Sequence, residues 1–431
     1  MKLQWFEGMD EQSAQLARGA IASLVGDGDL ETLTQTDLQD FLWYRLPAKW
    51  VVETAEHHEV AWALGDALRN VGLDRYATIC RQQTTHLIID AYDQSFKQGI
   101  AAYRKAAEAS GIEPPDTDQI AWGAYMGPAE LAVRDRLAST LERAIVAGEL
   151  VPGARGWKKT AQRISEEFLS SIGADGRVPL EVVEAERIEV WARAGGRHRA
   201  ALHRAVRPKL STETVDLPGK AVAESLTPAR ALLEGVGDGV TLTQAGYLPK
   251  ALAVELNERF RWQDPTIHKM HSEADVIGLR LLHGLLRRSR LLTKRASRLS
   301  VSAEGRRCLS DDERLFRLLA VQVLSGEQLD VDIAYLTAAA LLVAGAPQTR
   351  DQLMLAVLPA VEESWRATDG QPVGRERVAY GALDWRWNAR TLGWLHESGD
   401  WPDHREELTA VGRVATAIGL QAVASGPRQR P

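Results

Sequence analysis

The stretch SEADVIGLRLLHGLLRRSRLLTKRASRLSVSAEGR, residues 272–306, carries the clearest structural pattern in the sequence. Ser272 and Asp275 have the spacing of a capping box, and the apolar residues that follow recur with helical spacing. Two β-prone pieces then flank a short polar turn, which is typical of a β-hairpin. We therefore predict a helix over 272–288 and a hairpin over Arg290–Ser302.

The residues upstream add the elements that complete a small winged helix-turn-helix unit. Thr227 is expected to cap a short helix that opens with Pro228, because proline is well tolerated at the first helical position. Residues 240–243 are β-prone, and residues 248–260 repeat apolar side chains with helical spacing. Helix, short strand, helix, helix and hairpin is the order of a winged helix-turn-helix. This order predicts a basic winged-helix-like unit over residues 226–310.

A weak internal repeat predicts a second unit near the C-terminus. Trp394–Trp401 parallels Leu285–Leu292, and both copies lead through a polar turn to Ser or Thr followed by Ala-x-Gly-Arg. A hydroxyl at that position can cap the helix that leaves the hairpin. We expect a hairpin over Trp401–Thr409, with a turn two residues shorter than in the first copy. The second winged-helix-like unit then ends a helical region over 311–425.

The rest of the chain shows helical periodicity interrupted by Gly and Pro clusters. The predicted fold class is mostly α, with a helical N-terminal half followed by two winged-helix-like units with short β-hairpins. The expected segments are an acidic helical domain over 1–150, a helical extension with a basic segment over 151–210, and a polar linker over 211–225. Within the extension, the helical pattern resumes over 180–206. Aromatic residues at helical spacing in the first half are expected in the core, namely Trp43, Tyr44, Trp50, Trp62, Trp122 and Tyr125.

Composition bounds the class of protein. The chain has 431 residues, of which 45% are apolar and 26% charged, which indicates a multi-domain globular protein. Cys80 and Cys308 form no CxxC pattern, which excludes a disulfide framework or a zinc ribbon. The N-terminus has no signal-peptide pattern, and the apolar stretch 333–346 is too short to span a bilayer. We therefore expect a cytoplasmic protein without membrane contact.

The net charge of −6 conceals two basic stretches. Residues 280–307 hold nine Lys or Arg against the single Glu304, and residues 187–209 hold seven against the single Glu189. A local patch of this density can neutralise DNA phosphates even in a protein with a pI near 6.0. The alternative interpretation, a solvated basic helix face, stays open at this point.

The predicted helix places part of the first basic stretch on one face. Residues 280, 283, 284 and 287 have helical spacing and line a predicted exposed stripe. The opposite, buried face is expected to consist of Ile277, Leu281, Leu282, Leu285 and Leu286. The predicted DNA-binding residues are Arg280, His283, Arg287, Arg288, Lys294, Arg295 and Arg298. One objection is the acidic start of the helix, since Glu273 and Asp275 would repel phosphate where recognition helices usually meet bases.

Motifs of catalysis are absent from the sequence. It contains no P-loop, no HExxH and no nucleophile elbow, and the GxG of Gly235–Gly239 is expected to be a turn. We therefore predict no enzyme activity, no catalytic residue, no cofactor and no metal.

Two groups of histidines remain as alternatives to the absence of metal. His268, His271 and His283 could converge on zinc, which would need a fourth ligand and second-shell acceptors. One of His57 and His58 could lie near a carboxylate of another helix. Adjacent helical residues point about 100° apart, so a single metal rarely uses both.

The leading functional prediction is DNA binding, or a DNA-associated regulatory role, through residues 280–307. The alternative is a scaffold without nucleic-acid contact that binds a protein partner through the second winged-helix-like unit. That unit is acidic, because residues 383–413 hold four arginines and six acidic residues.

Four motifs resemble those of a known group of sequences. They are TQTDLQDFLWYRLPAKW at 34–50, EPPDTD at 113–118, GELVPGARGW at 148–157 and LTQAGYLP at 242–249. The chain resembles uncharacterised actinobacterial proteins, parts of which are similar to accessory regions of plasmid ORF-3-like proteins. The resemblance implies a helical front half and a winged-helix-like back half, and it implies no activity or cofactor.

Overall fold

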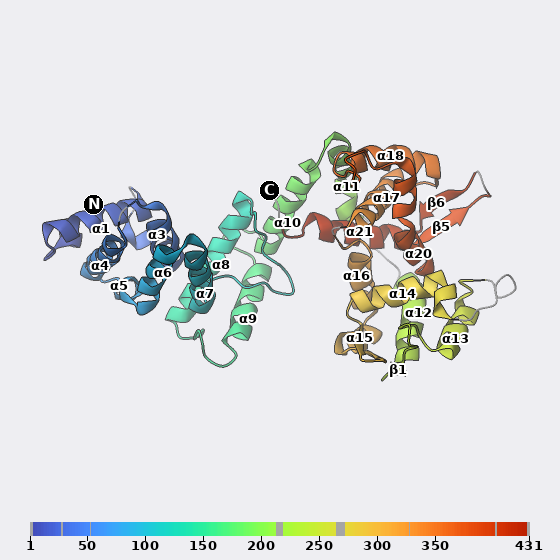
Figure 1. Cartoon of the computed structure of the whole chain (residues 1–431), viewed down its shortest axis with the longest axis horizontal. Helices are drawn as coiled ribbons and strands as arrows, with labels where there is room; N and C mark the ends of the chain where they lie inside the picture. The colour runs from blue at the N-terminus through green and yellow to red at the C-terminus, as the bar shows by residue number, and fades with distance from the viewer. Residues whose placement is uncertain are drawn as a thin grey trace. The chain divides into compact units, whose positions relative to one another are not determined.

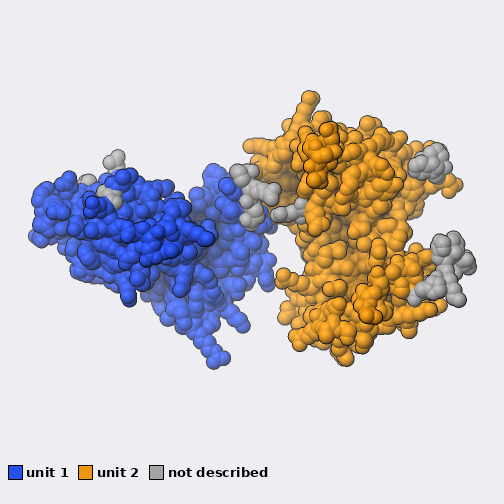
Figure 2. Space-filling model, in the orientation of Figure 1, with its two compact units in different colours: residues 1–186, 427–431 blue, residues 187–426 orange. Residues whose placement is uncertain are grey.

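The protein forms two compact units. A computed structural model describes residues 3–26, 29–51, 53–212, 219–263, 272–326, 328–400 and 403–428. Unit 1 comprises Met1–Glu186 with Pro427–Pro431, and unit 2 comprises Arg187–Gly426 (Figure 2). The boundary between the units lies within the helix α10, Pro179–Arg193.

Unit 1 is built from helices joined by loops (Figure 1). Its segment 35–49 is helical throughout, with a π-helical turn at Phe41–Arg45 between two short α-helices. The 3-10 turns of unit 1 are η1 Leu3–Phe6 and η2 Leu30–Thr32. Its α-helices are α1 Glu11–Val25, α2 Gln35–Asp40, α3 Leu46–Lys49, α4 Thr54–Asn70, α5 Asp74–Arg81, α6 Gln83–Gln94, α7 Phe96–Ser110, α8 Pro128–Val146 and α9 Trp157–Ser170, followed by α10.

A buried carboxylate ties three of these helices together. Glu142 of α8 accepts hydrogen bonds from the Gln35 backbone N–H at 3.0 Å, the Arg75 guanidinium at 2.6 Å and the Tyr76 hydroxyl at 2.8 Å. A buried carboxylate is tolerated when its oxygens are paired in this way. The expectation that the aromatic residues are core is confirmed for Trp43, which is 1% exposed.

The same expectation is wrong for two other aromatic residues. Trp62 is 50% exposed and Tyr125 is 46% exposed. Helical spacing identifies a repeated face of a helix but does not say whether another helix covers that face.

Unit 2 contains all the strands among the described residues (Figure 1). Its helices are α11 Arg197–Thr212, α12 Gly219–Val236, α13 Lys250–Phe260, η4 Glu273–Asp275, α14 Ile277–Arg288, α15 Ala303–Leu309, α16 Asp312–Gln322, α17 Leu329–Ala344, α18 Arg350–Glu362, α19 Arg375–Gly381, α20 Leu383–Thr391 and α21 Ala410–Ala424. Its strands are β1 Val240–Thr241, β2 Leu292–Arg295, β3 Arg298–Val301, β4 Gln348–Thr349, β5 Leu395–Ser398 and β6 Arg405–Leu408. None of the described helices is both long enough and apolar enough to cross a membrane.

A similar order of elements occurs twice in unit 2. Repeat 1, residues 219–322, runs helix, strand, helix, 3-10 turn, helix, hairpin and two helices, α15 and α16. Repeat 2, residues 329–424, has the short helix α19 in place of the 3-10 turn and the single helix α21 after the hairpin. The three strands of each antiparallel sheet are ordered β1-β3-β2 and β4-β6-β5, so the short first strand pairs with the last strand in both. The predicted mostly-α fold with two short hairpins is thus confirmed.

The hairpin of repeat 2 lies earlier in the chain than predicted. The expected hairpin over Trp401–Thr409 is wrong in position, because its first strand is β5 at Leu395–Ser398. The connection between its strands covers residues 399–404, whereas residues 296–297 connect the strands of repeat 1. The turn of the second copy is therefore longer rather than shorter.

Strand register and caps align the two repeats residue by residue. Leu292 pairs with Val301 and Leu395 pairs with Leu408, so Leu292 and Leu395 are equivalent. The helices after the hairpins are capped alike, by Ser302 on the N–H of Gly305 and by Thr409 on the N–H of Gly412. The Ser/Thr-Ala-x-Gly-Arg part of the predicted repeat is therefore confirmed, but Leu292 corresponds to Leu395 and not to Trp401.

The helices before the hairpins end alike as well. The N–H of Leu291 donates to the carbonyl of Leu286, and the N–H of Trp394 donates to the carbonyl of Ala389. Counting back from these bonds makes Arg287 equivalent to Arg390.

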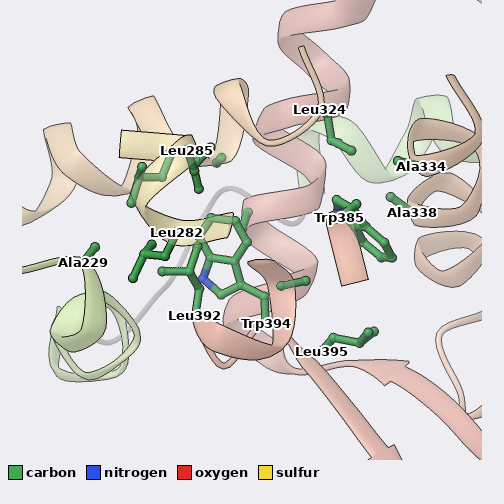
Figure 3. Close-up of a cluster of buried hydrophobic side chains, with 14 of the residues drawn as sticks. Ala229, Leu282, Leu285, Leu324, Ala334, Ala338, Trp385, Leu392, Trp394 and Leu395 are labelled. Atoms are coloured by element: carbon green, nitrogen blue, oxygen red, sulfur yellow. The ribbon is translucent and has the colours of Figure 1, made fainter. Parts of the chain in front are cut away.

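Both repeats contribute to one hydrophobic core. Figure 3 shows Ala229, Leu282 and Leu285 of repeat 1 in the same cluster as Trp385 and Trp394 of repeat 2. Helices α14 and α20 pack against each other, and a Cβ atom placed on Gly278 would lie 3.0 Å from Oγ1 of Thr391. The two predicted C-terminal segments are consequently parts of a single unit.

Three local expectations need correction. Residues 219–225, expected in a linker, form the first turns of α12, while residues 213–218 lie outside the described part. Thr227 and Pro228 lie inside α12 rather than at a helix start. The helical pattern over 180–206 is interrupted between α10 and α11, where Gly195 adopts a φ of 86° that favours glycine.

Candidate nucleic-acid interface

The β2–β3 hairpin presents the basic turn to solvent. Leu299 and Val301 are buried, whereas Lys294, Arg295 and Arg298 are exposed. Ala296 takes a φ of 51° in the two-residue turn, which brings Arg295 directly opposite Arg298 across the hairpin. Like charges at directly opposed positions destabilise a strand pair. The positive charges at the hairpin tip therefore do not stabilise the hairpin.

Helix α14 exposes three arginines on one side. Arg280, Arg287 and Arg288 are exposed, and Gly278 faces repeat 2. At 3.6 residues per turn, Arg280 lies about 200° around the helix from Gly278. The packing of α14 on α20 therefore leaves the arginine side open.

Two predictions about this helix are wrong. His283, expected on the exposed stripe, is 5% exposed, and its Nδ1 lies 2.8 Å from Oε1 of Glu273. His283 lies at the edge of the exposed side of α14, and the turn that contains Glu273 covers its ring. Ile277, expected in the buried face, is 41% exposed at the first position of α14.

Only one of the two acidic residues before the helix can repel phosphate. Glu273 is 1% exposed, and its carboxylate also accepts the N–H of Leu248 at 2.6 Å. The predicted capping box is present, since Asp275 accepts the N–H of Ser272 at 2.8 Å, but it caps the 3-10 turn η4. Helix α14 begins at Ile277, so the predicted helix start at Ser272 is wrong. Asp275 alone presents an exposed carboxylate there, so the repulsion that we anticipated from two acidic residues is reduced to one.

Six exposed cations of α14 and the β2–β3 hairpin make up the group that we name the basic face. They are Arg280, Arg287, Arg288, Lys294, Arg295 and Arg298. Among the described residues, the side chains of the first five have no ion-pair or hydrogen-bond partner. Strand register places Lys294 on the same side of the hairpin as Leu299, and Arg295 and Arg298 on the other side. Arg298 donates to the backbone carbonyl of Asp238 at 3.3 Å, which leaves its charge without a counter-ion in the described part. The predicted DNA-binding residues are thus exposed, with the exception of His283.

Several cations of the other basic stretch, residues 187–209, form contacts within unit 2. Arg187 is 3% exposed and donates to the carbonyl of Ser425 at 2.9 Å. Arg199 pairs with Asp332, and Arg193 and Arg207 both pair with Glu189. Four of the seven cations in residues 187–209 are therefore engaged within unit 2, and the exposed Arg197 has no ion-pair partner in the described part of the chain.

The equivalent surface of repeat 2 carries an ion pair where repeat 1 carries two cations. Arg390 of α20 pairs with Glu397 of β5, and Arg386 pairs with Glu406 of β6 at 2.9 Å. The positions of Arg390 and Glu397 correspond to Arg287 and Lys294 in repeat 1. The ion pair shows that a helix residue and a hairpin residue at these positions lie on the same side of the repeat. In repeat 1 both positions carry a positive charge.

One group of possible metal ligands lies in the same part of repeat 2. Ligand atoms of Glu397, His404 and Glu406 lie within 4.8 Å of one another. Arg386 and Arg390 already compensate both carboxylates, and two guanidinium groups would repel a cation. Burial lowers the pKa of Arg390 below its ordinary value, as expected for a charge held in this interior. We interpret the group as an ion-pair network.

The predicted histidine cluster stays a prediction, because His268 and His271 lie outside the described residues. Nδ1 of His283 lies 2.8 Å from Oε1 of Glu273, and its Nε2 is buried without a hydrogen-bond partner in the described part of the chain. The GxG at Gly235–Gly239 forms a turn before β1, as expected, with the N–H of Gly239 donating to the carbonyl of Val236. Comparisons of the chain with protein-family models, with curated proteins and with solved structures returned no match.

Proposed function

We propose that repeat 1 is a winged helix-turn-helix unit that binds the phosphate backbone of duplex DNA through the basic face. The order of its elements, with α14 as the groove-facing helix and β2–β3 as the wing, supports the proposal. The observation that carries it is the set of exposed cations without counter-charges. Unpaired Lys and Arg are the groups that release condensed counter-ions from DNA.

The comparison with repeat 2 strengthens this proposal. A solvated basic helix face would account for α14 alone, but it would not account for cations on a neighbouring hairpin as well. The positions of Arg287 and Lys294 could form an ion pair, as their counterparts do, if either were acidic. A polyanionic ligand supplies the missing negative charge at these positions.

A salt titration of affinity for a short fluorescent duplex tests the proposal. The test variant replaces Lys294, Arg295 and Arg298 by alanine in the full chain. Each lost phosphate contact lowers the magnitude of the slope of log affinity against log salt by about 0.9, so three contacts lower it by about 2.7. Binding should weaken uniformly across sequences, because backbone contacts carry no sequence information.

A matched control removes the same charge elsewhere. Lys97, Arg104 and Lys105 are exposed on α7 and have no ion-pair partner among the described residues. Their replacement by alanine leaves the net charge equal to that of the test variant, and we expect the wild-type slope. Equal slopes for wild type and test variant, or no binding at low salt, would refute the proposal. The test variant should fold normally, because surface substitutions change stability by about 0.5 kcal/mol or less.

A second candidate function is a protein scaffold that acts through repeat 2. Its helices expose large apolar side chains, namely Leu355 at 76%, Tyr380 at 53% and Leu383 at 40%. Exposed apolar side chains favour protein contact when nearby charges are already paired. This candidate predicts a salt-tolerant association with a protein and no salt-dependent binding to DNA.

A further inference from the structure

Two histidines of unit 1 converge from neighbouring helices. His58 of α4 and His86 of α6 approach each other with 2.8 Å between their Nδ1 atoms, and their ring centroids are 5.0 Å apart. The neighbouring His57 takes no part in this contact, because its Nε2 faces the carbonyl of Trp50 at 3.3 Å. The contact is independent of the basic face, which belongs to unit 2.

A carboxylate orients one of the two rings. Nε2 of His58 lies 2.9 Å from Oδ1 of Asp90, so its N–H donates to that carboxylate. The lone pair of His58 is then on Nδ1 and faces His86. A carboxylate behind the second nitrogen is the arrangement that fixes the tautomer of metal-binding histidines and raises the basicity of the free nitrogen.

The second ring is held neutral and is partly covered. Burial lowers the pKa of His86 below its ordinary value, with a smaller contribution from His58. Its Nε2 is buried and has no hydrogen-bond partner among the described residues. The ring of Trp62 lies 5.2 Å from that of His86 and stands half-exposed beside the pair. A neutral imidazole is the protonation state that a metal ion binds.

We propose that His58 and His86 bind a divalent transition-metal ion through their Nδ1 atoms, with Asp90 as a positioning residue and water as the remaining ligands. Imidazole nitrogen is a suitable ligand for Zn²⁺, Ni²⁺ and Cu²⁺. Two nitrogens at zinc-ligand distance in a tetrahedral site are roughly 3.3 Å apart, so the rings separate by about 0.5 Å. Without the ion, the proton between the two Nδ1 atoms belongs to His86. When the ion binds, that proton moves to Nε2 of His86, so both Nδ1 lone pairs face the ion.

Isothermal titration of the full chain with ZnCl₂ in a non-chelating buffer tests the site. Wild type should bind one ion that is lost in His58→Gln and in His86→Gln. Asp90→Asn keeps both ligands but removes the orienting carboxylate, and should weaken binding by about 10- to 100-fold. His396→Gln removes an exposed histidine of repeat 2 and serves as the control that should bind like wild type.

A second readout locates the ion. Bound Cu²⁺ should quench the indole emission of Trp62, and this part of the quenching should disappear in Trp62→Phe. Circular dichroism of the metal-free variants separates lost binding from lost folding. Zinc uptake by wild type that equals that of His58→Gln and His86→Gln would overturn the proposal. Loss of the ion in His404→Gln would also overturn it, by placing the ion at Glu397, His404 and Glu406 instead.

Discussion

Repeats 1 and 2 have a similar order of elements, the same strand order and the same type of cap on the helix after the hairpin, yet they differ in charge. Repeat 2 holds four of its charges in ion pairs, the nearly buried pair of Arg386 with Glu406 and the partly exposed pair of Arg390 with Glu397. Repeat 1 has Arg287 and Lys294 at the positions of the second pair, and both are exposed without a counter-charge. Ion pairing is therefore not needed to form this backbone. We propose that the free cations of repeat 1 meet a polyanionic ligand.

The largest expected effect concerns the buried ion pair of repeat 2. The side chains of Arg386 and Glu406 are each about 10% exposed, so Glu406→Gln leaves a buried guanidinium without its counter-charge. Removing one partner of such a pair costs about 3–5 kcal/mol of unfolding free energy. Urea denaturation of wild type and variant measures this loss.

A double variant sharpens the same comparison. Because both charges are then absent, Arg386→Leu with Glu406→Leu should recover most of the stability. In repeat 1, Lys294→Ala should change the unfolding free energy by about 0.5 kcal/mol or less, since no pair is broken. A loss below about 1 kcal/mol in Glu406→Gln would contradict the description of repeat 2 as internally compensated.

The next effect is the acid sensitivity of the contact between α11 and repeat 2. His203 accepts the hydroxyl of Tyr335 at 2.7 Å and donates to the carbonyl of Trp191 at 2.9 Å. Burial is the main cause that lowers the pKa of His203 to about 4. The unfolded chain, with a histidine pKa near 6.5, then binds more protons between these values. Stability is lost as the pH falls from about 6.5 to about 4, by about 3 kcal/mol.

Denaturation at pH 7 and at pH 4 checks this expectation. His203→Phe retains a ring that can stack on Trp191, whose centroid lies 4.1 Å from that of His203. The variant should lose less stability on acidification than wild type, because carboxylates titrate in both but the imidazole titrates only in wild type. An equal loss in both proteins would show that His203 does not titrate in this range.

A smaller loss of stability is expected when a side chain is added at Gly305 or Gly412, where each repeat brings a backbone carbonyl close to the helix start. A Cβ atom on Gly305 would meet the carbonyl of Leu291, and one on Gly412 would meet the carbonyl of Trp394 at closer range, both under 3.0 Å. Gly305→Ala and Gly412→Ala should each cost about 1–3 kcal/mol, with the larger loss at Gly412. Thermal unfolding of the two variants ranks them. A neutral result at either glycine would break the structural equivalence of the two helix starts.

Local patterns in the sequence were sufficient for much of repeat 1. The capping box at Ser272, the hairpin over Arg290–Ser302 and the exposure of its basic turn follow from spacing and alternation, and all three are confirmed. These features depend on neighbouring residues along the chain. The burial of His283 could not be predicted in this way, because it depends on contact with the carboxylate of Glu273 in the preceding turn.

Features that depend on pairing between distant residues were missed. Arg187 and Arg199 raise the basic density of the sequence, but their partners Ser425 and Asp332 lie far along the chain. The second hairpin was misplaced because the Ser/Thr-Ala-x-Gly-Arg motif marks the end of the hairpin and leaves its loop length free. An alignment of β5 with β2 places Glu397 at the position equivalent to Lys294. This exchange of charge is the main difference between the two repeats.

The most direct test converts repeat 1 to the charge pattern of repeat 2. Lys294→Glu places a carboxylate where Glu397 stands, so that it pairs with Arg287 and removes two cations from the basic face. The salt titration of duplex affinity should give a slope reduced in magnitude by about 0.9 for Lys294→Ala and by about 1.8 for Lys294→Glu. Slopes equal to that of wild type in both variants would contradict the claim that these cations meet phosphate.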